Sequence, residues 1–137
     1  TFVMCAAELD GRREQVGCDL EKIGQLKENI AGRFFCREEY EAILEEESED
    51  TRTELFYRYW VLKESFMKAT GKGMALPVDA FCIRMGDPPV LVRQPREFPG
   101  DYYSEKSCYC NLYKKQALKT NIHAPIIQIL ICCIATY

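Results

Sequence analysis

The segment from Glu54 to Leu76 constrains the fold of this 137-residue chain most. Its apolar residues recur at i, i+4, i+7, i+11 and i+14, namely Leu55, Tyr59, Leu62, Phe66 and Ala69. This spacing lines them up along one side of an α-helix, so we predict a helix that buries the stripe in the core. We expect the helix to end at Gly71 and Gly73, because glycine readily adopts the left-handed conformation that terminates helices.

A second face of the predicted helix carries charged residues. Trp60, Glu64 and Lys68 follow one another at i, i+4 and i+8, and Lys63 lies between this face and the apolar stripe. Taken alone, the spacing of Glu64 and Lys68 favours a solvent-exposed ion pair worth about 0.2 to 0.5 kcal/mol, which is commoner in helices than a catalytic pair. The spacing by itself therefore leaves both a structural and a chemical role open.

The run from Gln15 to Ile23 is typical of a strand that returns from a turn at Asp10-Gly11, after a first strand at 2–7. Because side chains alternate along a strand, Asp19 and Glu21 share one face, with their Cα atoms roughly 7 Å apart. The ordinary alternative is an edge strand whose polar face is in water. Two carboxylates on one face are nevertheless a candidate cation site.

These stretches resemble the signatures of one family. From Trp60 to Pro77 the pattern W-x-x-K-E-S-x-x-K, followed by G-K-G-x-x-x-P, resembles the signature helix of the 4'-phosphopantetheinyl transferases, especially the two-lobed type that activates nonribosomal peptide and polyketide synthases. The run V-G-C-D-L-E resembles the family's other signature, G-[IV]-D-[IV]-E, with Cys18 where a β-branched residue is usual. The segment IAGRFFCREEYEAIL resembles the helix pair between the two signatures.

The predicted fold class is α+β, with an antiparallel sheet packed against the long helix and a shorter helix pair. We expect helices over 31–35 and 37–46, a solvated loop over 45–50, and an exposed connection at Pro95 and Pro99. The remaining strands are expected at 80–84, 90–93 and 107–113.

The resemblance covers 1–113, which we interpret as one transferase-like lobe, the second of two in a longer parent protein. Residues 114–137 form an atypical tail. Its apolar run from Ile126 to Ile134 could replace the family's closing strand, or the tail could be an abnormal reading frame.

Composition limits the function further. A net charge of -3 and a pI near 5.3 argue against a nucleic-acid-binding surface, so phosphate chemistry would depend on local lysines or a metal. The longest apolar run is shorter than the about 20 residues that span a bilayer, which predicts no membrane segment.

We expect a cytoplasmic protein whose eight cysteines behave as small hydrophobic residues, since no C-x-x-C pair and no leader is present. A zinc site at Cys108, Cys110 and His123 is a weak alternative.

The site residues follow from both arguments. Mg²⁺ prefers oxygen ligands, and Asp19, Glu21 and Glu64 would form such a set if the helix lies across the strand. The same three match the family's metal positions, and Glu64 also matches its proposed base. Lys68 matches the lysine that contacts the diphosphate and assists the leaving group, and Lys63 would be a secondary phosphate contact. We expect coenzyme A to be bound by Lys63, Lys68, Lys72 and Gly73.

By resemblance, the chain would transfer the 4'-phosphopantetheine arm of coenzyme A to a serine of an apo acyl or peptidyl carrier protein and release 3',5'-ADP. Three arrangements remain open. The chain is the metal-bearing lobe of a two-lobed enzyme whose first lobe is missing, a self-assembling single-lobe holo-acyl-carrier-protein synthase, or an inactive lobe that only binds a carrier protein.

Overall fold

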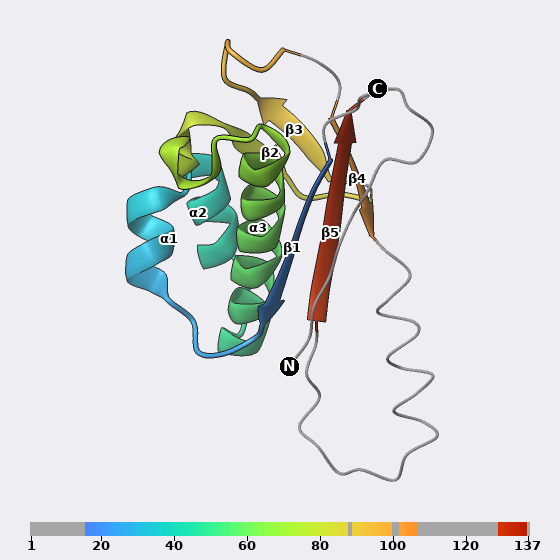
Figure 1. Cartoon of the computed structure of the whole chain (residues 1–137). Coiled ribbons are helices and arrows are strands. Elements are labelled where there is room, and N and C mark those ends of the chain that lie inside the picture. The colour runs from blue at the N-terminus through green and yellow to red at the C-terminus, as the bar shows by residue number, and fades with distance from the viewer. Residues whose placement is uncertain (1–15, 88, 100–101, 107–128, 137) are drawn as a thin grey trace, which may run out of the picture.

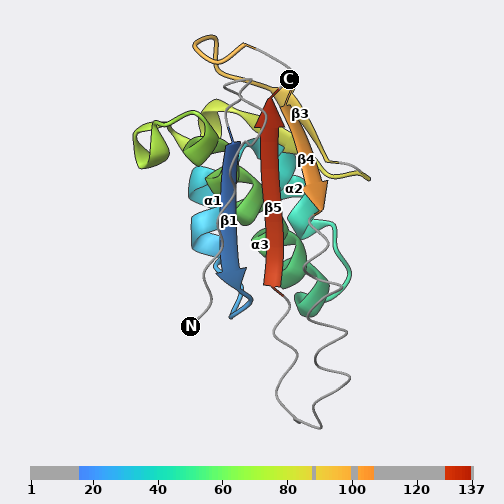
Figure 2. The same cartoon turned by 45° about the vertical axis from the view of Figure 1, so that its right-hand side comes forward.

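The computed structural model describes residues 16–87, 89–99, 102–106 and 129–136. In these residues, five strands form one antiparallel sheet with the order β1-β5-β4-β3-β2. The helices all lie on one face of the sheet (Figures 1 and 2). The predicted α+β class is thereby confirmed. None of the helices in the described part is long and apolar enough to cross a membrane.

The long helix α3 runs from Glu49 to Ala69 and packs against β1 and β5. It begins earlier than its apolar stripe because Ser48 caps it, accepting a 3.1 Å hydrogen bond from the Thr51 amide. Two residues of the predicted 45–50 loop therefore belong to its first turn. The helix ends as expected, since Gly71 and Gly73 have positive φ angles of 71° and 52°.

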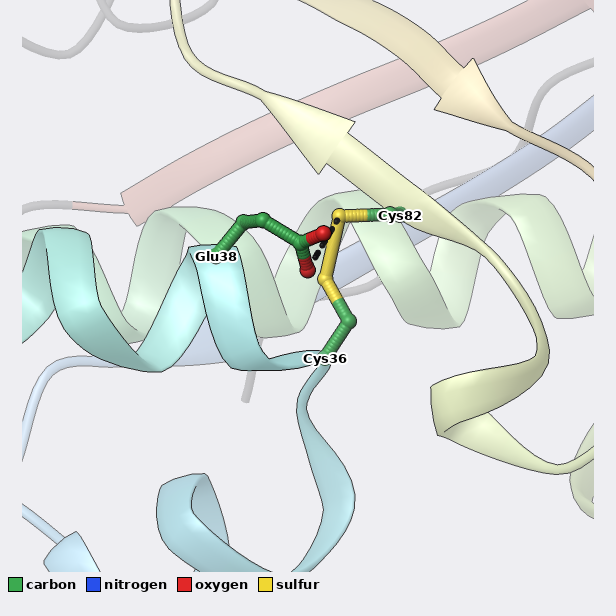
Figure 3. A group of neighbouring side chains, drawn as sticks. All are labelled: Cys36, Glu38 and Cys82. Carbon is green, nitrogen blue, oxygen red and sulfur yellow. Dashed lines mark hydrogen bonds between the residues drawn. A yellow bond between two sulfur atoms is a disulfide. The ribbon is translucent and has the colours of Figure 1, made fainter.

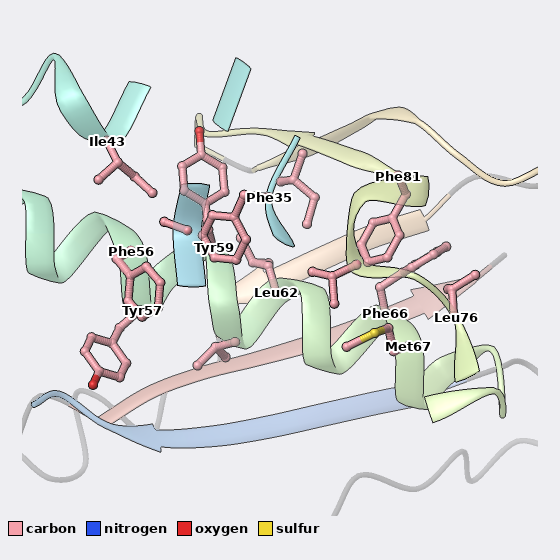
Figure 4. Close-up of a cluster of buried hydrophobic side chains, with 14 residues drawn as sticks. Phe35, Ile43, Phe56, Tyr57, Tyr59, Leu62, Phe66, Met67, Leu76 and Phe81 are labelled. Carbon is pink, nitrogen blue, oxygen red and sulfur yellow. The ribbon is translucent and has the colours of Figure 1, made fainter. Parts of the chain in front are cut away.

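The apolar stripe of α3 is the centre of the core (Figure 4). Tyr59, Leu62, Phe66 and Ala69 are all buried, and Leu55 packs at the margin. On the side away from β1, aromatic rings from other elements complete the layer. Phe35 stacks on Phe56 with 5.4 Å between ring centroids, and Phe81 lies 4.5 Å from Phe66. One helix thus joins two layers of the molecule.

Strand β1 (Val16–Lys22) confirms the predicted strand and carries Asp19 and Glu21. It pairs along its whole length with β5 (Ile129–Thr136), so that Asp19 is opposite Cys132. β5 also pairs with β4, so it lies between β1 and β4 in the sheet. From Ile129 onward, the apolar run that we left open is therefore a strand of the sheet. The proposed boundary between 113 and 114 lies outside the described residues.

The other elements are shorter. They are the helices α1 (Glu28–Phe34) and α2 (Arg37–Leu44), the 3-10 turns η1 (Gly73–Ala75) and η2 (Val78–Ala80), and the strands β2 (Cys82–Arg84), β3 (Val90–Arg93) and β4 (Tyr102–Lys106). The helix pair and the strands near 80–84 and 90–93 were predicted. β4 comes earlier than the expected third strand. The predicted strands at 2–7 and 107–113 and the Asp10-Gly11 turn lie outside the described residues.

Candidate active site

The candidate site lies where β1 meets the C-terminal half of α3. Their close approach depends on Gly17, because a Cβ at this position would overlap the carbonyl oxygen of Ser65 and lie 2.5 Å from the Ala69 nitrogen. Glycine therefore lets the strand backbone lie directly on the helix backbone. Two residues further along the strand, Asp19 reaches the same helix.

Asp19 is the most buried acid of the site, with 9% of its side chain exposed. Its Oδ1 accepts a 2.6 Å hydrogen bond from Nζ of Lys68, whose own side chain is 47% exposed. Its Oδ2 is buried and accepts no hydrogen bond from the described residues. A buried carboxylate oxygen without a partner is costly, and a bound cation would satisfy it.

Glu64 is half-buried one helical turn before Lys68. Burial raises the pKa of its carboxyl most, and the negative charges of Asp19 and Glu21 raise it further, while Lys68 acts in the opposite direction. Glu64 is therefore close enough to the other two acids predicted from the sequence to be repelled by their charges. A divalent cation would relieve this repulsion and would find the oxygen donors that Mg²⁺ prefers.

The three carboxylates are neighbours but do not form a closed coordination shell. In the described part of the chain, only one set of three potential metal ligands from His, Cys, Asp or Glu has its donor atoms within 4.8 Å of one another. That set is Cys36, Glu38 and Cys82. Lys68 already occupies Oδ1 of Asp19. A cation held by Asp19, Glu21 and Glu64 would thus draw the side chains together and compete with Lys68 for Asp19.

Lys68 is positively charged in this setting. Partial burial would lower its pKa, but the hydrogen bond and charge of Asp19, with smaller contributions from Glu64 and Cys18, outweigh burial and raise it. Because the ammonium group is also half-exposed, it can contact an anionic ligand without leaving the site. Its chemical role would be to offset negative charge on a phosphate.

The structure places Lys63 elsewhere than we expected. Its side chain is fully buried between α3, α2 and the segment 78–81, 2.9 Å from the carboxylate of Glu39, and it donates hydrogen bonds to the carbonyl oxygens of Val78 (2.7 Å) and Phe81 (2.9 Å). These three partners use the three N–H donors of an ammonium group. The expectation that Lys63 contacts phosphate is therefore revised to a structural role.

Glu39 is the partner that the sequence did not reveal. It lies at the third position of α2, and its carboxylate also accepts hydrogen bonds from the amides of Cys36 (3.1 Å) and Ile83 (2.8 Å). Burial raises the pKa of Glu39 and lowers that of Lys63, and each charge counteracts the effect on the other. A lysine close to the apolar stripe of a helix was the available signal, since a buried charge needs a partner.

Lys72 and Gly73 follow the end of α3. Lys72 is half-exposed, and its Nζ lies 3.7 Å from Glu97, itself 71% exposed. Gly73 begins the short turn η1 and has open space where a side chain would be. The described contacts do not connect either residue to Asp19 or Glu64, so their part in ligand binding stays a prediction.

The cysteines differ from the expectation that they act only as small hydrophobic residues. Cys36 and Cys82 form a disulfide, whereas Cys18 is free. The proposed zinc site at Cys108, Cys110 and His123 lies outside the described residues.

Comparison with known proteins identifies relatives over most of the chain. Residues 15–120 match the family described as the 4'-phosphopantetheinyl transferase superfamily. The chain is 35% identical over 114 residues to 4'-phosphopantetheinyl transferase Sfp of Bacillus subtilis, which covers 82% of this chain and 46% of that protein. It is 29% identical over 143 residues to 4'-phosphopantetheinyl transferase gsp of Aneurinibacillus migulanus, covering 96% and 55%. The chain thus spans about half the length of these curated relatives.

The fold also has a counterpart among solved structures. Holo-[acyl-carrier-protein] synthase of Thermotoga maritima superposes with a TM-score of 0.59, covering 89% of this chain and 62% of that chain. At 18% identity this likeness concerns the fold alone.

Proposed function

The chain belongs to the 4'-phosphopantetheinyl transferase superfamily, and from this we propose that it carries the metal-binding part of an enzyme that transfers 4'-phosphopantetheine from coenzyme A to a serine of an apo carrier protein. The other product would be 3',5'-ADP. The observation that supports this most is the buried Oδ2 of Asp19, which lacks a partner among the described residues and lies beside Glu64 and Lys68.

Mg²⁺ is the proposed cofactor, and Asp19, Glu21 and Glu64 are the residues that would hold it. When bound, it would offset the negative charge that phosphoryl transfer spreads over phosphate oxygens. The hard oxygen donors of the three acids and their mutual repulsion support this choice over a softer metal.

The chain's own residues would position substrates and move one proton. Glu64, with its raised pKa, would accept the proton of the carrier serine hydroxyl, directly or through a water molecule. Lys68 would bind a diphosphate oxygen of coenzyme A and offset the charge that grows on the leaving group. Lys72 and Gly73, at the same end of α3, would also contact coenzyme A.

The first-ranked arrangement is a lobe of a longer enzyme. The relatives are about twice as long as the part that this chain matches, which supports a two-lobed parent. A self-assembling single-lobe enzyme is the second candidate, supported by the superposition on the holo-[acyl-carrier-protein] synthase over 89% of the chain. Size-exclusion chromatography separates them, since a defined oligomer favours self-assembly and a monomer favours the lobe.

Transfer activity tests the proposed chemistry. We expect Glu64→Gln to lower the rate of pantetheinylation of an apo carrier protein at least 100-fold, because both the proton acceptor and a metal ligand are altered. Glu47→Gln, in the exposed connection before α3, is the matched control and should keep the full rate. The assay is run by mass spectrometry with Mg²⁺ and coenzyme A, on the chain and on a longer parent protein.

Each outcome of that assay has a distinct meaning. A normal rate for Glu64→Gln would contradict the role assigned to this residue. A chain that binds an apo carrier protein but neither Mg²⁺ nor coenzyme A would instead be a binding module.

A further inference from the structure

The disulfide between Cys36 and Cys82 joins two segments that are 46 residues apart in the sequence (Figure 3). Cys36 is the residue before α2, and Cys82 is the first residue of β2. Both are buried, with exposed fractions of 3% and 2%. Near them, the exposed Glu38 places Oε2 3.8 Å from Sγ of Cys82. The covalent link therefore lies at the seam between the helix pair and the sheet.

The linked segments also hold the buried ion pair of Glu39 and Lys63. The Cys36 amide donates a hydrogen bond to Glu39 Oε2, and the Ile83 amide, next to Cys82, donates one to Glu39 Oε1. On the other side of Cys82, the carbonyl oxygen of Phe81 accepts a hydrogen bond from Lys63. The disulfide thus joins the two backbone segments that supply these hydrogen bonds.

We propose that Cys36 and Cys82 are a redox-controlled clamp on the Glu39–Lys63 ion pair. With the disulfide formed, α2 and β2 cannot separate, so the polar groups around the pair stay in place. With the disulfide reduced, the same contacts depend on packing alone, and opening this seam would leave two buried charges without partners, which is costly. Because Lys63 precedes Glu64 in α3, the clamp supports the helical turn that carries the candidate site.

The redox step is an ordinary thiol–disulfide exchange with a small dithiol. A thiolate of the dithiol attacks one sulfur, the Cys36–Cys82 bond breaks, and the departing thiolate takes up a proton. The second thiol of the reductant then attacks the mixed disulfide. In sum, two electrons and two protons pass from the dithiol to the cysteines, and the reductant becomes a cyclic disulfide.

A metal site is the competing interpretation of the same cluster. The two sulfurs and a Glu38 oxygen lie within 4.8 Å of one another, and thiolates are good zinc ligands. The structure favours the clamp, because the sulfurs are bonded to each other and a disulfide leaves no thiolate to bind a metal.

Thermal unfolding of the full chain, with and without a dithiol reductant, tests the clamp. We expect reduction to lower Tm by roughly 10 °C, because a disulfide that closes a long loop restricts the unfolded chain. The double variant Cys36→Ser, Cys82→Ser should already unfold at the lower temperature and should not respond to the reductant. Cys18→Ser, which removes a cysteine that is free in the described part of the chain, should keep the full response.

Amide hydrogen exchange locates the effect. The amides of Cys36 and Ile83 should exchange at least tenfold faster after reduction than before it. The Leu62 amide, in the middle of α3, reports global unfolding and should change less. Equal acceleration at all three amides would overturn the clamp, since the disulfide would then act only through the unfolded chain.

Two other results would also overturn the proposal. One is a Tm response to the reductant that persists in the double variant. The other is a reduced chain whose Tm returns to the oxidised value on addition of one equivalent of Zn²⁺, which would make the cluster a metal site.

Discussion

Glu64 illustrates how single residues of the candidate site destabilise the ligand-free fold while they prepare the site to bind a cation or accept a proton. Its carboxylate is partly desolvated and faces the charges of Asp19 and Glu21, which together raise its pKa. Asp19 shares the conflict, since one of its oxygens is buried without a hydrogen bond from the described residues. Such carboxylates destabilise the ligand-free fold, and binding of a cation or of a proton removes this electrostatic cost.

The pH dependence of stability follows from the direction of this shift. A carboxyl with a raised pKa in the folded state favours folding while it is protonated, and that contribution is lost as pH rises through the folded-state pKa. Without metal at pH 7, we therefore expect Glu64→Gln to raise Tm by about 2 °C. The gain should disappear below about pH 4, where the wild-type carboxyl is protonated.

Calorimetry in the presence of a chelator measures this difference, and Glu47→Gln again serves as the control. A lower Tm for Glu64→Gln at pH 7 would show that the carboxylate is stabilised in the fold, contrary to this description of the site.

Among the elements, α3 contacts both the strands beside the candidate site and the segments that surround Lys63. One side of it packs on β1 and β5 and presents Glu64 and Lys68 to the strand acids. An adjacent face buries Lys63 against α2 and the segment that leads into β2. The position of the candidate site therefore depends on both contacts of this helix.

The contact with β1 depends on Gly17. We expect Gly17→Ala to destabilise the fold by about 3 kcal/mol, because the added methyl group overlaps backbone atoms of α3 that cannot move independently. Urea denaturation measures the loss. Gly24→Ala is the control, since its Cβ would meet only the Tyr57 hydroxyl, at 3.1 Å. Equal stability for both variants would contradict the close strand–helix contact.

The contact with α2 depends on the ion pair. Lys63→Met should cost about 3 to 5 kcal/mol, because it leaves the Glu39 carboxylate buried without its counter-charge. Adding Glu39→Gln should recover much of that loss, since the amide oxygen can still accept a hydrogen bond and carries no charge. A double-mutant cycle by urea denaturation measures the coupling, and additive losses would show that the two side chains do not interact.

For the molecule as a whole, local patterns were predictable and distant pairings were not. The apolar period of 55–69 and the glycines after it predicted α3 and its end, and alternation predicted that Asp19 and Glu21 share a face of β1. The place of β5 between β1 and β4 could not be read from periodicity, because strand order depends on contacts more than 100 residues apart.

Side-chain partners across elements were equally inaccessible. The helical pattern set Lys63 beside the stripe but could not identify Glu39, which lies on another helix. Eight cysteines permit many pairings, so the Cys36–Cys82 disulfide could be identified only from the structure. The three acids were predicted as a site because their spacing and the family resemblance agree, whereas the effect of Asp19 and Glu21 on Glu64 required the structure.

The proposed magnesium site is tested best by locating where a divalent ion binds. Mn²⁺ takes the same oxygen donors as Mg²⁺ and broadens the NMR signals of nearby nuclei, so it detects even weak sites. We predict that Mn²⁺ broadens the amide signals of Asp19, Glu21 and Glu64, that excess Mg²⁺ reverses this, and that Asp19→Asn abolishes it. Broadening that is absent, or that remains unchanged in Asp19→Asn, would contradict a metal site formed by the three acids.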